Sequence, residues 1–387
     1  MGKFGGSLAG LTAPDLGVAA ATAALDRAAC DAGGIEIDEA FFGCGRQAGS
    51  GPNVARQIAY RALGEENGTR VPAMTVNQAC ASGLQAIALA SERIIQGRAH
   101  AVLAGGTESM SRLPYLLENA RWGTKLGHQQ VTDAMYKDGF LCPLSDMLMG
   151  ETAELLAEEL GISREEQDLY AVESHHKAAA AWEAGRFSDE VVPIELKEKK
   201  TTRTMDRDET FRPDVSTEKM AKLPTVFKQG GTVTPGNASQ ITDGAAAVVV
   251  VSETRLKQLG GDPLARIVDW STVAIDPKRM GLGPVPAIAA LLARTGGALE
   301  DFDLIELNEA FAAQVLACGR ELKFNRDRLN VLNVNGGAIA LGHPIGCTGT
   351  RIVVTLLHEM KRRGATKGLA TLCVSGGLGM AMSFERP

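Results

Sequence analysis

Hydrophobic and polar positions change their spacing within residues 75–91, TVNQACASGLQAIALAS. Beta-branched residues lead into the stretch, and polar residues follow them. After Gly83 the apolar positions take helical spacing, as at Leu84 and Ile87. The pattern predicts a strand, a tight turn and a helix, with Cys80 in the turn close to the start of the helix.

This position of Cys80 has two interpretations. A helix N-terminus favours an anion, so a thiolate there would be more available than that of a free cysteine, whose pKa is about 8.5. Cysteine is also among the most buried residue types, which favours a structural role in the core. The stretch alone leaves both interpretations open.

Strands and helices alternate through the first part of the chain, which predicts a parallel or mixed sheet covered by helices. The predicted helices are 13–31, 53–63 and the one after Gly83, and the predicted strands are 40–44, 71–76 and 99–106.

The middle of the chain differs in character. Residues 112–148 are irregular, a helix is predicted at 150–160, and a capping box from Ser163 opens a helix to about residue 184. The charged segment 196–207 is interpreted as a solvated face or loop rather than as a phosphate site. We therefore expect an inserted loop domain at 112–240, which divides an N-terminal half (1–111 and 241–263) and precedes a C-terminal half (264–387).

The C-terminal part repeats the first architecture. Cys80, a helix, a strand and Gly105-Gly106 match Cys347, a helix, a strand and Gly376-Gly377 in order and rough spacing. Such similarity predicts two duplicated halves of βαβαβ type with mixed sheets, whose strand-end loops meet at one cleft. The predicted strands here are 245–251, 266–275, 303–307, 331–335 and 369–374, and the predicted helices are 286–294, 309–322 and 348–363.

Composition narrows the class of protein. The 387 residues carry a net charge of −6 without a long block of one sign, which argues against nucleic acid and against stable membrane association. The N-terminus is too rich in glycine for a signal peptide, and no long apolar run occurs. Seven cysteines without a CxxC pair argue against disulfides and zinc. We expect a cytoplasmic protein without a metal site.

Four loops that follow predicted strands carry candidate chemistry, because ligands gather outside strand ends in α/β sheets. They present Cys80, Asn308 with Glu309, His343 in the most glycine-rich loop, and Cys373. The paired His175-His176 are interpreted as surface or packing residues. A Walker phosphate loop, a GxGxxG dinucleotide loop and a GxSxG elbow are all absent.

At this point the chain resembles the thiolases, which are CoA-dependent acetyl- and ketoacyl-transferases. The resemblance covers nearly the whole chain and rests on eight segments in the same order. They are NQACASG, GGTESMS, GRFSDEVVPI, MAKLPTVF, GTVTPGNAS, NEAFAAQ, GGAIALGHPIGCTG and CVSGGLG. The resemblance implies a five-layered αβαβα core with the loop domain inserted.

The resemblance also implies roles. Cys80 is the nucleophile that carries the acyl group, and His343 is the base that activates it. Cys373 moves a proton at the α-carbon of the second acetyl-CoA. Asn308 holds a water that forms one oxyanion hole with His343, and the backbone N–H groups of Cys80 and Ser375 form the other.

Five further positions are expected to line the acyl and CoA sites: Ser239, Arg212, Leu148, Met149 and Phe311. Thioester exchange needs a soft nucleophile, and carbon–carbon bond formation needs a base and donors for an enolate, so no cofactor is expected beyond CoA as a substrate. The expected partners are acetyl-CoA, acyl-CoA and CoA. A homodimer or homotetramer is expected from the family.

Three departures from the family pattern stand out. Leu148 occupies a position where short-chain biosynthetic thiolases often carry His, which is compatible with longer acyl chains. Ser375 replaces a usual Gly, but its role would be played by the backbone. Family members usually place a strand before the equivalent of GKFGGSLAG, so either the start is truncated or the first sheet lacks an edge strand. We expect a truncated start at Met1, because losing a core strand would cost stability.

Other classes remain as alternatives. A decarboxylating condensing enzyme usually pairs Cys with two His, or with His and Asn, and Cys373 argues against it. A Cys-His hydrolase would need neither Cys373 nor the NEAF segment. An acyl-CoA- or lipid-binding protein without condensation activity would have been marked by loss of Cys80 or His343, and both are present.

Overall fold

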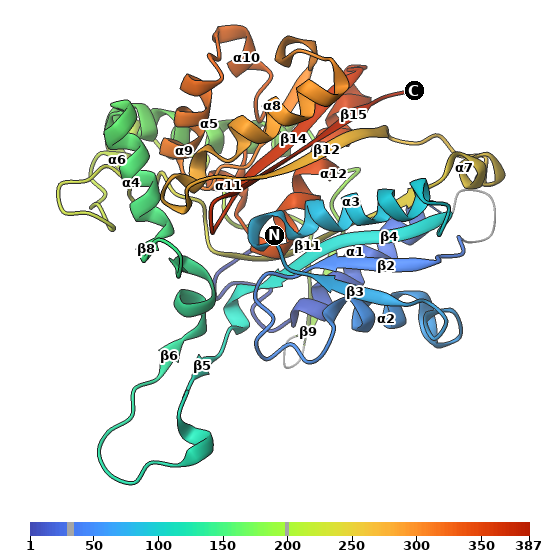
Figure 1. The fold of residues 1–387 in the computed structure, drawn as a ribbon, viewed down its shortest axis with the longest axis horizontal. Coiled ribbons are helices and arrows are strands. Elements are labelled where there is room, and N and C mark those ends of the chain that lie inside the picture. Colours follow the sequence, from blue (N-terminus) through green and yellow to red (C-terminus); the bar gives the residue numbers. More distant parts are fainter. Residues whose placement is uncertain (29–34, 198–200) are drawn as a thin grey trace.

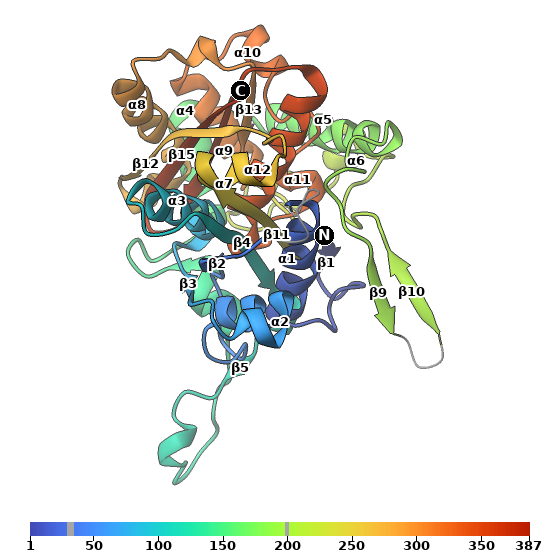
Figure 2. The ribbon, with the colours of Figure 1, turned by 90° about the vertical axis from the view of Figure 1, so that its right-hand side faces the viewer.

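The computed structural model describes residues 1–28, 35–197 and 201–387. Two mixed sheets lie on either side of a central pair of helices, and further helices cover the outer face of each sheet (Figure 1, Figure 2). The layers therefore run helix, sheet, helix, sheet, helix, which confirms the five-layered α/β fold. Among the described residues, no helix is both long enough and apolar enough to cross a membrane.

The first sheet has the order β1-β11-β4-β2-β3. Strand β11 is antiparallel to both of its neighbours, whereas β2 is parallel to β4 and β3. Strands β4 and β11 pair although residues 112–240 separate them in the sequence. The strands are β1 (Gly2–Lys3), β2 (Glu39–Gly43), β3 (Ala73–Val76), β4 (Ala101–Ser109) and β11 (Thr242–Val251).

The second sheet repeats these directions in the order β12-β15-β14-β13. Strand β15 is antiparallel to both neighbours, and β14 is parallel to β13. A single parallel bridge between Leu332 and Ile305 takes the place that β3 has in the first sheet. The matching order confirms the predicted duplication. The strands are β12 (Arg266–Ala274), β13 (Leu304–Leu307), β14 (Lys367–Val374) and β15 (Leu378–Glu385).

Alternation along the strands builds the layers, because successive side chains point to opposite faces. In β2, Phe42 packs on the outer helices α1 (Ala13–Ala28) and α2 (Val54–Gly68), whereas Phe41 faces the central helices α3 (Ser82–Ile95) and α12 (Ile345–Arg363). In β14, Leu369 faces the outer helices α8 (Pro284–Thr295) and α9 (Ala312–Glu321), and Leu372 faces inward.

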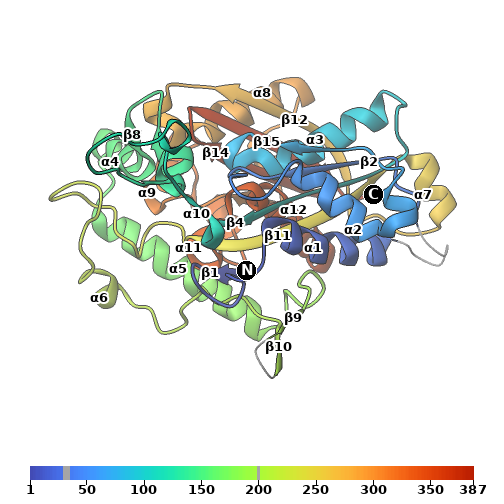
Figure 3. The same ribbon diagram turned by 90° about the horizontal axis from the view of Figure 1, so that it is seen from below.

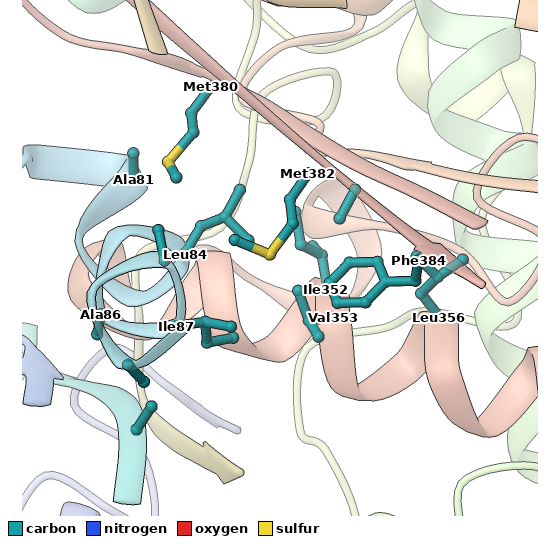
Figure 4. Packing of buried hydrophobic residues seen from close by; sticks show 14 of the residues in the cluster. Ala81, Leu84, Ala86, Ile87, Ile352, Val353, Leu356, Met380, Met382 and Phe384 are labelled. Atoms are coloured by element: carbon teal, nitrogen blue, oxygen red, sulfur yellow. The ribbon is translucent and has the colours of Figure 1, made fainter. Parts of the chain in front are cut away.

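The central helices are buried between the two sheets. Leu84 and Ile87 of α3 meet Ile352 of α12, and Met382 and Phe384 of β15 close over them (Figure 4). Each fully buried side chain of this kind contributes about 1.5–3 kcal/mol relative to an exposed one. This shared core fixes the N-termini of α3 and α12 relative to each other.

The segment between β4 and β11 forms helices and small hairpins around this core. An arm that carries β5 and β6 projects from the body (Figure 1), and the β9–β10 hairpin extends on another side (Figure 2). Helix α5, opened by the Ser163 capping box as predicted, runs beside the core (Figure 3). The elements are β5 (Tyr115–Leu116), β6 (Thr132–Asp133), β7 (Leu141–Cys142), β8 (Met147–Leu148), α4 (Met149–Leu160), α5 (Arg164–Glu183), β9 (Ile194–Lys197), β10 (Thr202–Met205) and α6 (Thr217–Met220).

The strand predicted at 331–335 is wrong. Asn333 has a positive φ of 44°, which breaks the extended backbone. Its side-chain amide accepts from the N–H of Leu307 at 2.9 Å and donates to the carbonyl of Leu307 at 2.8 Å. The side chain therefore replaces the backbone pairing that a strand would have supplied.

Other boundaries also differ from the prediction. Helix α9 begins at Ala312 rather than at Glu309, because Phe311 is extended and bridges to Ala238. Strand β15 was not predicted. Within the charged segment, β9 and β10 form a hairpin with mostly exposed side chains, as a solvated face would. Residues 29–31 of the first predicted helix and residues 198–200 lie outside the described part of the chain. The remaining short helices are α7 (Glu253–Leu259), α10 (Arg326–Asn330) and α11 (Ala338–Leu341).

Candidate active site

Cys80 lies in the turn between β3 and α3. Its neighbour Ala79 has a φ of 45°, which is uncommon for a residue with a side chain and turns the backbone sharply. The hydroxyl of Ser82 accepts from the N–H of Gln78 at 2.9 Å and donates to the carbonyl of Ala79 at 2.6 Å. The turn is thus held from within, and the half-buried Cys80 precedes the first residue of α3.

Glycines bring the start of α12 onto this turn. A Cβ on Gly83 would lie 2.8 Å from the backbone N of Thr350, and one on Gly106 would lie 2.0 Å from the carbonyl oxygen of Gly346. Real side chains do not tolerate such distances, so α12 approaches α3 closely only with glycine at 83, and approaches β4 closely only with glycine at 106. Ile345 of α12 packs in one apolar cluster with Cys80.

His343 lies immediately before α12 and is buried. Its Nδ1 lies 2.6 Å from the hydroxyl oxygen of Thr348, and that hydroxyl is 3.0 Å from the carbonyl oxygen of Pro344. A carbonyl oxygen only accepts, so the hydroxyl donates to Pro344 and accepts from Nδ1–H. This assignment leaves Nε2 unprotonated, as a general base requires.

The charge state of His343 agrees with that role. Burial lowers the pKa of His343 to about 3, and the cations of Arg46 and Arg351 act in the same direction. The imidazole is therefore neutral at rest near neutral pH and can accept a proton.

Cys373 lies at the end of β14, where Gly376 and Gly377 turn the chain into β15. The backbone N–H of Ser375 in this turn acts on Cys80 and lowers the pKa of its thiol. Burial raises the pKa of the Cys373 thiol well above its usual value, and the nearby charge of a Cys80 thiolate raises it further. Burial also raises the pKa of Cys80, against the opposing effects of the Ser375 N–H and the Arg46 cation. The two thiols are thus close enough to influence each other.

Asn308 follows β13 directly, and its backbone N–H donates to the carbonyl of Thr371 at 3.0 Å, two residues before Cys373. Its side chain is buried, and neither amide atom has a hydrogen-bond partner in the described part of the chain. Buried amides are seldom left unpaired, so this one is available to a small polar molecule. The adjacent Glu309 is instead saturated by Tyr170, Ser174, Asn333 and Ile339 and holds the loops together.

The positions expected to line the acyl and CoA sites divide into two groups. Met149 and Phe311 share an apolar cluster with Cys373, and Leu148 directly precedes Met149. The backbone of Ser239 donates to the carbonyl of Ala310, while that of the next residue accepts from His343. The structure thus brings these four beside the catalytic candidates. Arg212 is exposed, and its backbone contacts His175 and Val215 on another part of the molecule.

Two charged residues near Cys80 were not singled out from the sequence. The buried carboxylate of Glu108 accepts from the N–H groups of Gly45, Arg46 and Gly346, which joins the ends of β2 and β4 to α12. Burial raises its pKa, against the effect of the Arg46 cation and these N–H groups. Arg46 is itself buried, and its charge acts on both Cys80 and His343.

A signal for some of these residues was present in the sequence. Glu108 and Thr348 stand inside the GGTESMS and GHPIGCTG segments, but their partners are distant in sequence or depend on the loop geometry. Arg46 follows a predicted strand, as the other candidates do. His175 is buried, and its Nδ1 accepts from the backbone N–H of Arg212 at 3.1 Å, as in a packing residue. Within the described ranges, no group of three His, Cys, Asp or Glu side chains is arranged to hold a metal ion.

Together the loops offer a soft nucleophile, a neutral base, a second thiol and polar donors around one point. Such a set suits transfer of an acyl group from one thiol to another, followed by proton transfer at a neighbouring carbon.

Comparisons with known proteins identify the family. Residues 1–254 match the family described as thiolase, N-terminal domain, and residues 261–386 match thiolase, C-terminal domain. An acetyl-CoA acetyltransferase of Pseudomonas aeruginosa is 49% identical over 387 residues, covering 100% of this chain and 96% of the relative.

Solved structures of similar proteins superpose on this chain over nearly its whole length. That of a Bacillus anthracis acetyl-CoA acetyltransferase superposes with a TM-score of 0.94 at 44% identity, covering 99% of this chain and 95% of that one. A human mitochondrial 3-ketoacyl-CoA thiolase in complex with CoA gives a TM-score of 0.93 at 42% identity, with 100% and 95% covered. From its fold, its loops and these matches, the chain belongs to the thiolase family.

Proposed function

We propose that this protein is a CoA-dependent acyltransferase that joins two acetyl-CoA molecules into acetoacetyl-CoA and, in reverse, cleaves 3-ketoacyl-CoA with CoA. The observation that carries the proposal is a pair of thiols beside the neutral His343: Cys80 in the turn before α3 and Cys373 at the end of β14. Acyl transfer alone needs one thiol, whereas carbon–carbon bond formation also needs a second base.

In the first half-reaction, Nε2 of His343 takes the proton of Cys80, and the thiolate attacks the thioester carbonyl. The N–H groups of Cys80 and Ser375 stabilise the oxyanion, and a positioned donor of this kind contributes about 2.7–4 kcal/mol. The C–S bond to CoA then breaks. Cys373 gives its proton to the departing CoA thiolate, which leaves acyl-Cys80, the Cys373 thiolate and protonated His343.

In the second half-reaction, the Cys373 thiolate removes a proton from the α-carbon of the next acetyl-CoA. Its raised pKa makes it a strong base for this weakly acidic position. Asn308, through a water, and His343 stabilise the enolate. The enolate carbon attacks acyl-Cys80, and the released Cys80 thiolate recovers its proton from His343, so every group returns to its starting state.

The substrate-binding positions belong to the same proposal. Met149, Phe311 and Ser239 line the path of the pantetheine and acyl groups, and Arg212 contacts CoA at its adenosine end. The apolar Leu148 extends the pocket toward longer 3-ketoacyl chains. The division of the chain into two halves and a covering segment at 112–240 follows from the same relationship.

A homodimer or homotetramer in the cytoplasm completes the proposal. Strand β3 lies at one edge of the first sheet, and its Met74 is 43% exposed, which suits isologous pairing of two copies. The projecting arm exposes 86% of Trp122 and 96% of Leu126, and apolar side chains so exposed usually mark an interface.

The test measures the steady-state rates of acetoacetyl-CoA synthesis and of acetoacetyl-CoA cleavage. Wild-type protein is expected to form acetoacetyl-CoA from acetyl-CoA and to cleave acetoacetyl-CoA with CoA, with the parallel double-reciprocal lines of a ping-pong reaction. If acyl-CoA binds without turnover in either direction, the protein is an acyl-CoA-binding relative, and the proposal is wrong.

A further inference from the structure

Arg46 lies at the wall of a cavity of about 530 Å³ beside the candidate active site. The cavity also reaches Ser375, whose backbone N–H lowers the pKa of Cys80. Only 6% of Arg46 is exposed. In the part of the chain that the structure describes, its guanidinium makes no hydrogen bond or ion pair, and its Nε is buried without a partner.

The structure provides a fitted place for this guanidinium. A Cβ on Gly139 would lie 1.9–2.2 Å from three of its atoms, so the group occupies space that only a glycine leaves open. On another side it lies 5.3 Å from the centre of the Phe140 ring, within the range of a cation–π contact. The guanidinium is therefore held in position, with its hydrogen-bond donors unused.

The charges around Arg46 do not pair with it directly. The negative charge of Glu108 attracts Arg46, but the carboxylate oxygens of Glu108 accept from the backbone N–H groups of Gly45, Arg46 and Gly346 and not from the guanidinium. Asp138 is exposed at the cavity wall, and it too lies beyond ion-pair distance. Lys137, the other cation of the cavity wall, is paired with Glu118 at 2.5 Å.

A buried cation without a direct partner costs several kcal/mol, which an anionic ligand would offset. A guanidinium in a fixed position is suited to bidentate binding of a carboxylate. We propose that Arg46 binds a carboxylate at the far end of the acyl group, so that the preferred substrates are 3-oxo dicarboxylic acyl-CoA thioesters. This inference rests on the proposed function and names its substrate class.

The phosphates of CoA are not suited to this place. The pantetheine arm separates them from the thioester sulfur, so they cannot reach a group beside Cys80 while the thioester is on the nucleophile. The acyl tail, in contrast, begins at the carbon that Cys80 attacks. A carboxylate a few methylene groups along that tail would enter the cavity next to Ser375.

The test compares thiolysis of 3-oxohexanedioyl-CoA with that of 3-oxohexanoyl-CoA, which has the same chain length without the second carboxylate. Wild-type protein is expected to favour the dicarboxylic substrate in kcat/KM by at least about 10-fold, the value of one or two charge-assisted hydrogen bonds. Arg46→Met should lower this ratio by at least about 10-fold. The ratio cancels any common effect of Arg46 on the reactivity of Cys80.

Two matched variants distinguish carboxylate binding by Arg46 from an effect of the net charge of the cavity wall. Lys137→Met removes the other cation and should change the ratio by less than about 3-fold. Asp138→Asn removes the opposing charge and should raise the ratio. A wild-type ratio of one or below, or a ratio that falls in Lys137→Met but not in Arg46→Met, would overturn the proposal.

A binding measurement distinguishes failure of this inference from failure of the proposed function. In Cys80→Ala, calorimetric titration should show tighter binding of 3-oxohexanedioyl-CoA than of 3-oxohexanoyl-CoA, and Cys80→Ala with Arg46→Met should lose the difference. Equal affinities in Cys80→Ala contradict the role of Arg46 even if acetoacetyl-CoA is cleaved normally. If Cys80→Ala binds the dicarboxylic substrate selectively but the wild-type protein cleaves neither substrate, the proposed reaction is contradicted instead.

Discussion

The side chain of His343 is buried, and one hydroxyl group sets its tautomer. Thr348 lies one turn into α12. Its hydroxyl accepts a hydrogen bond from Nδ1–H of His343 and donates one to the carbonyl of Pro344. A neutral imidazole exposes only one nitrogen as a base, so the hydroxyl decides which nitrogen faces the substrate. Thr348 acts through His343 and is a positioning residue.

We predict that Thr348→Val lowers kcat by about 10–100-fold, a loss comparable to that from removing a partner that orients a functional histidine. Because valine has nearly the same shape, KM should change by less than about 3-fold. The acetylation rate of Cys80 should fall with kcat, which a purely structural role would not explain. Thr355→Val, later in the same helix and bonded to Glu190, is the control. Normal acetylation in Thr348→Val would contradict this role.

Asn308→Ala should lower kcat for acetoacetyl-CoA synthesis by about 100–1000-fold, the usual loss for one oxyanion-hole donor. The first half-reaction should suffer less, because the N–H groups of Cys80 and Ser375 serve its oxyanion. Rapid-quench measurement of CoA release separates the two steps. An equal loss in both half-reactions would show that Asn308 does not act specifically on the enolate.

At the scale of elements, the site depends on how closely α3 and α12 approach. A Cβ on Gly349 of α12 would lie 2.3 Å from the backbone N of Leu84, so the helices would have to separate. Gly319 in α9 has nothing closer than 3.7 Å in the same position. The two glycines are both inside helices but differ in their surroundings.

We predict that Gly349→Ala destabilises the protein by about 1–3 kcal/mol or more, through overpacking of the central layer. Gly319→Ala should instead stabilise it by about 0.5–1 kcal/mol, because glycine is unfavourable inside a helix. Urea unfolding of both variants measures the difference. A stable Gly349→Ala variant with full activity would mean that the crossing tolerates separation.

The sequence allowed most elements to be predicted where the pattern was local. The alternation in β2 and β14 and the Ser163 capping box depend on neighbouring residues alone. Residues 331–335 failed because Asn333 adopts a left-handed conformation and uses its side chain to pair with Leu307. That alternative depends on a partner 26 residues away, and the apolar pattern does not record it.

The same distinction applies to the candidate site. Cys80, His343, Cys373 and Asn308 each belong to a recognisable motif and could be named in advance. The positions of Glu108 and Arg46 depend on Gly45, Gly139 and Gly346, which three separate segments bring together. An unpaired cation in a cavity can be recognised only when all of its neighbours are known.

For the molecule as a whole, buried titratable groups set the pH range of stability. Burial raises the pKa of Glu306 to about 8 despite the attraction of Arg351 at 3.5 Å, and it raises the pKa of Glu190 to about 8 as well. The folded state then binds more protons than the unfolded state, whose Glu pKa is 4.5. Stability from these groups is fully present below pH 4.5 and is lost as pH rises through about 8.

His343 contributes in the opposite sense. Its folded pKa of about 3 lies below the ordinary 6.5, so its contribution is present above pH 6.5 and is lost as pH falls toward 3. We predict that Glu306→Gln makes the fall in unfolding free energy between pH 5 and 8 shallower, because one proton linkage is removed. Urea titrations across that range measure the slope. An unchanged slope would mean that Glu306 is ionised in the folded protein.

The central claim is that two thiols divide the reaction between them, and mass analysis of the protein after incubation with labelled acetyl-CoA tests it most directly. We predict one acetyl group on Cys80 in the wild-type protein and in Cys373→Ala, none in Cys80→Ala, and acetoacetyl-CoA formation only in the wild type. An acetyl group on another residue, or condensation at the wild-type rate in Cys373→Ala, would contradict the account.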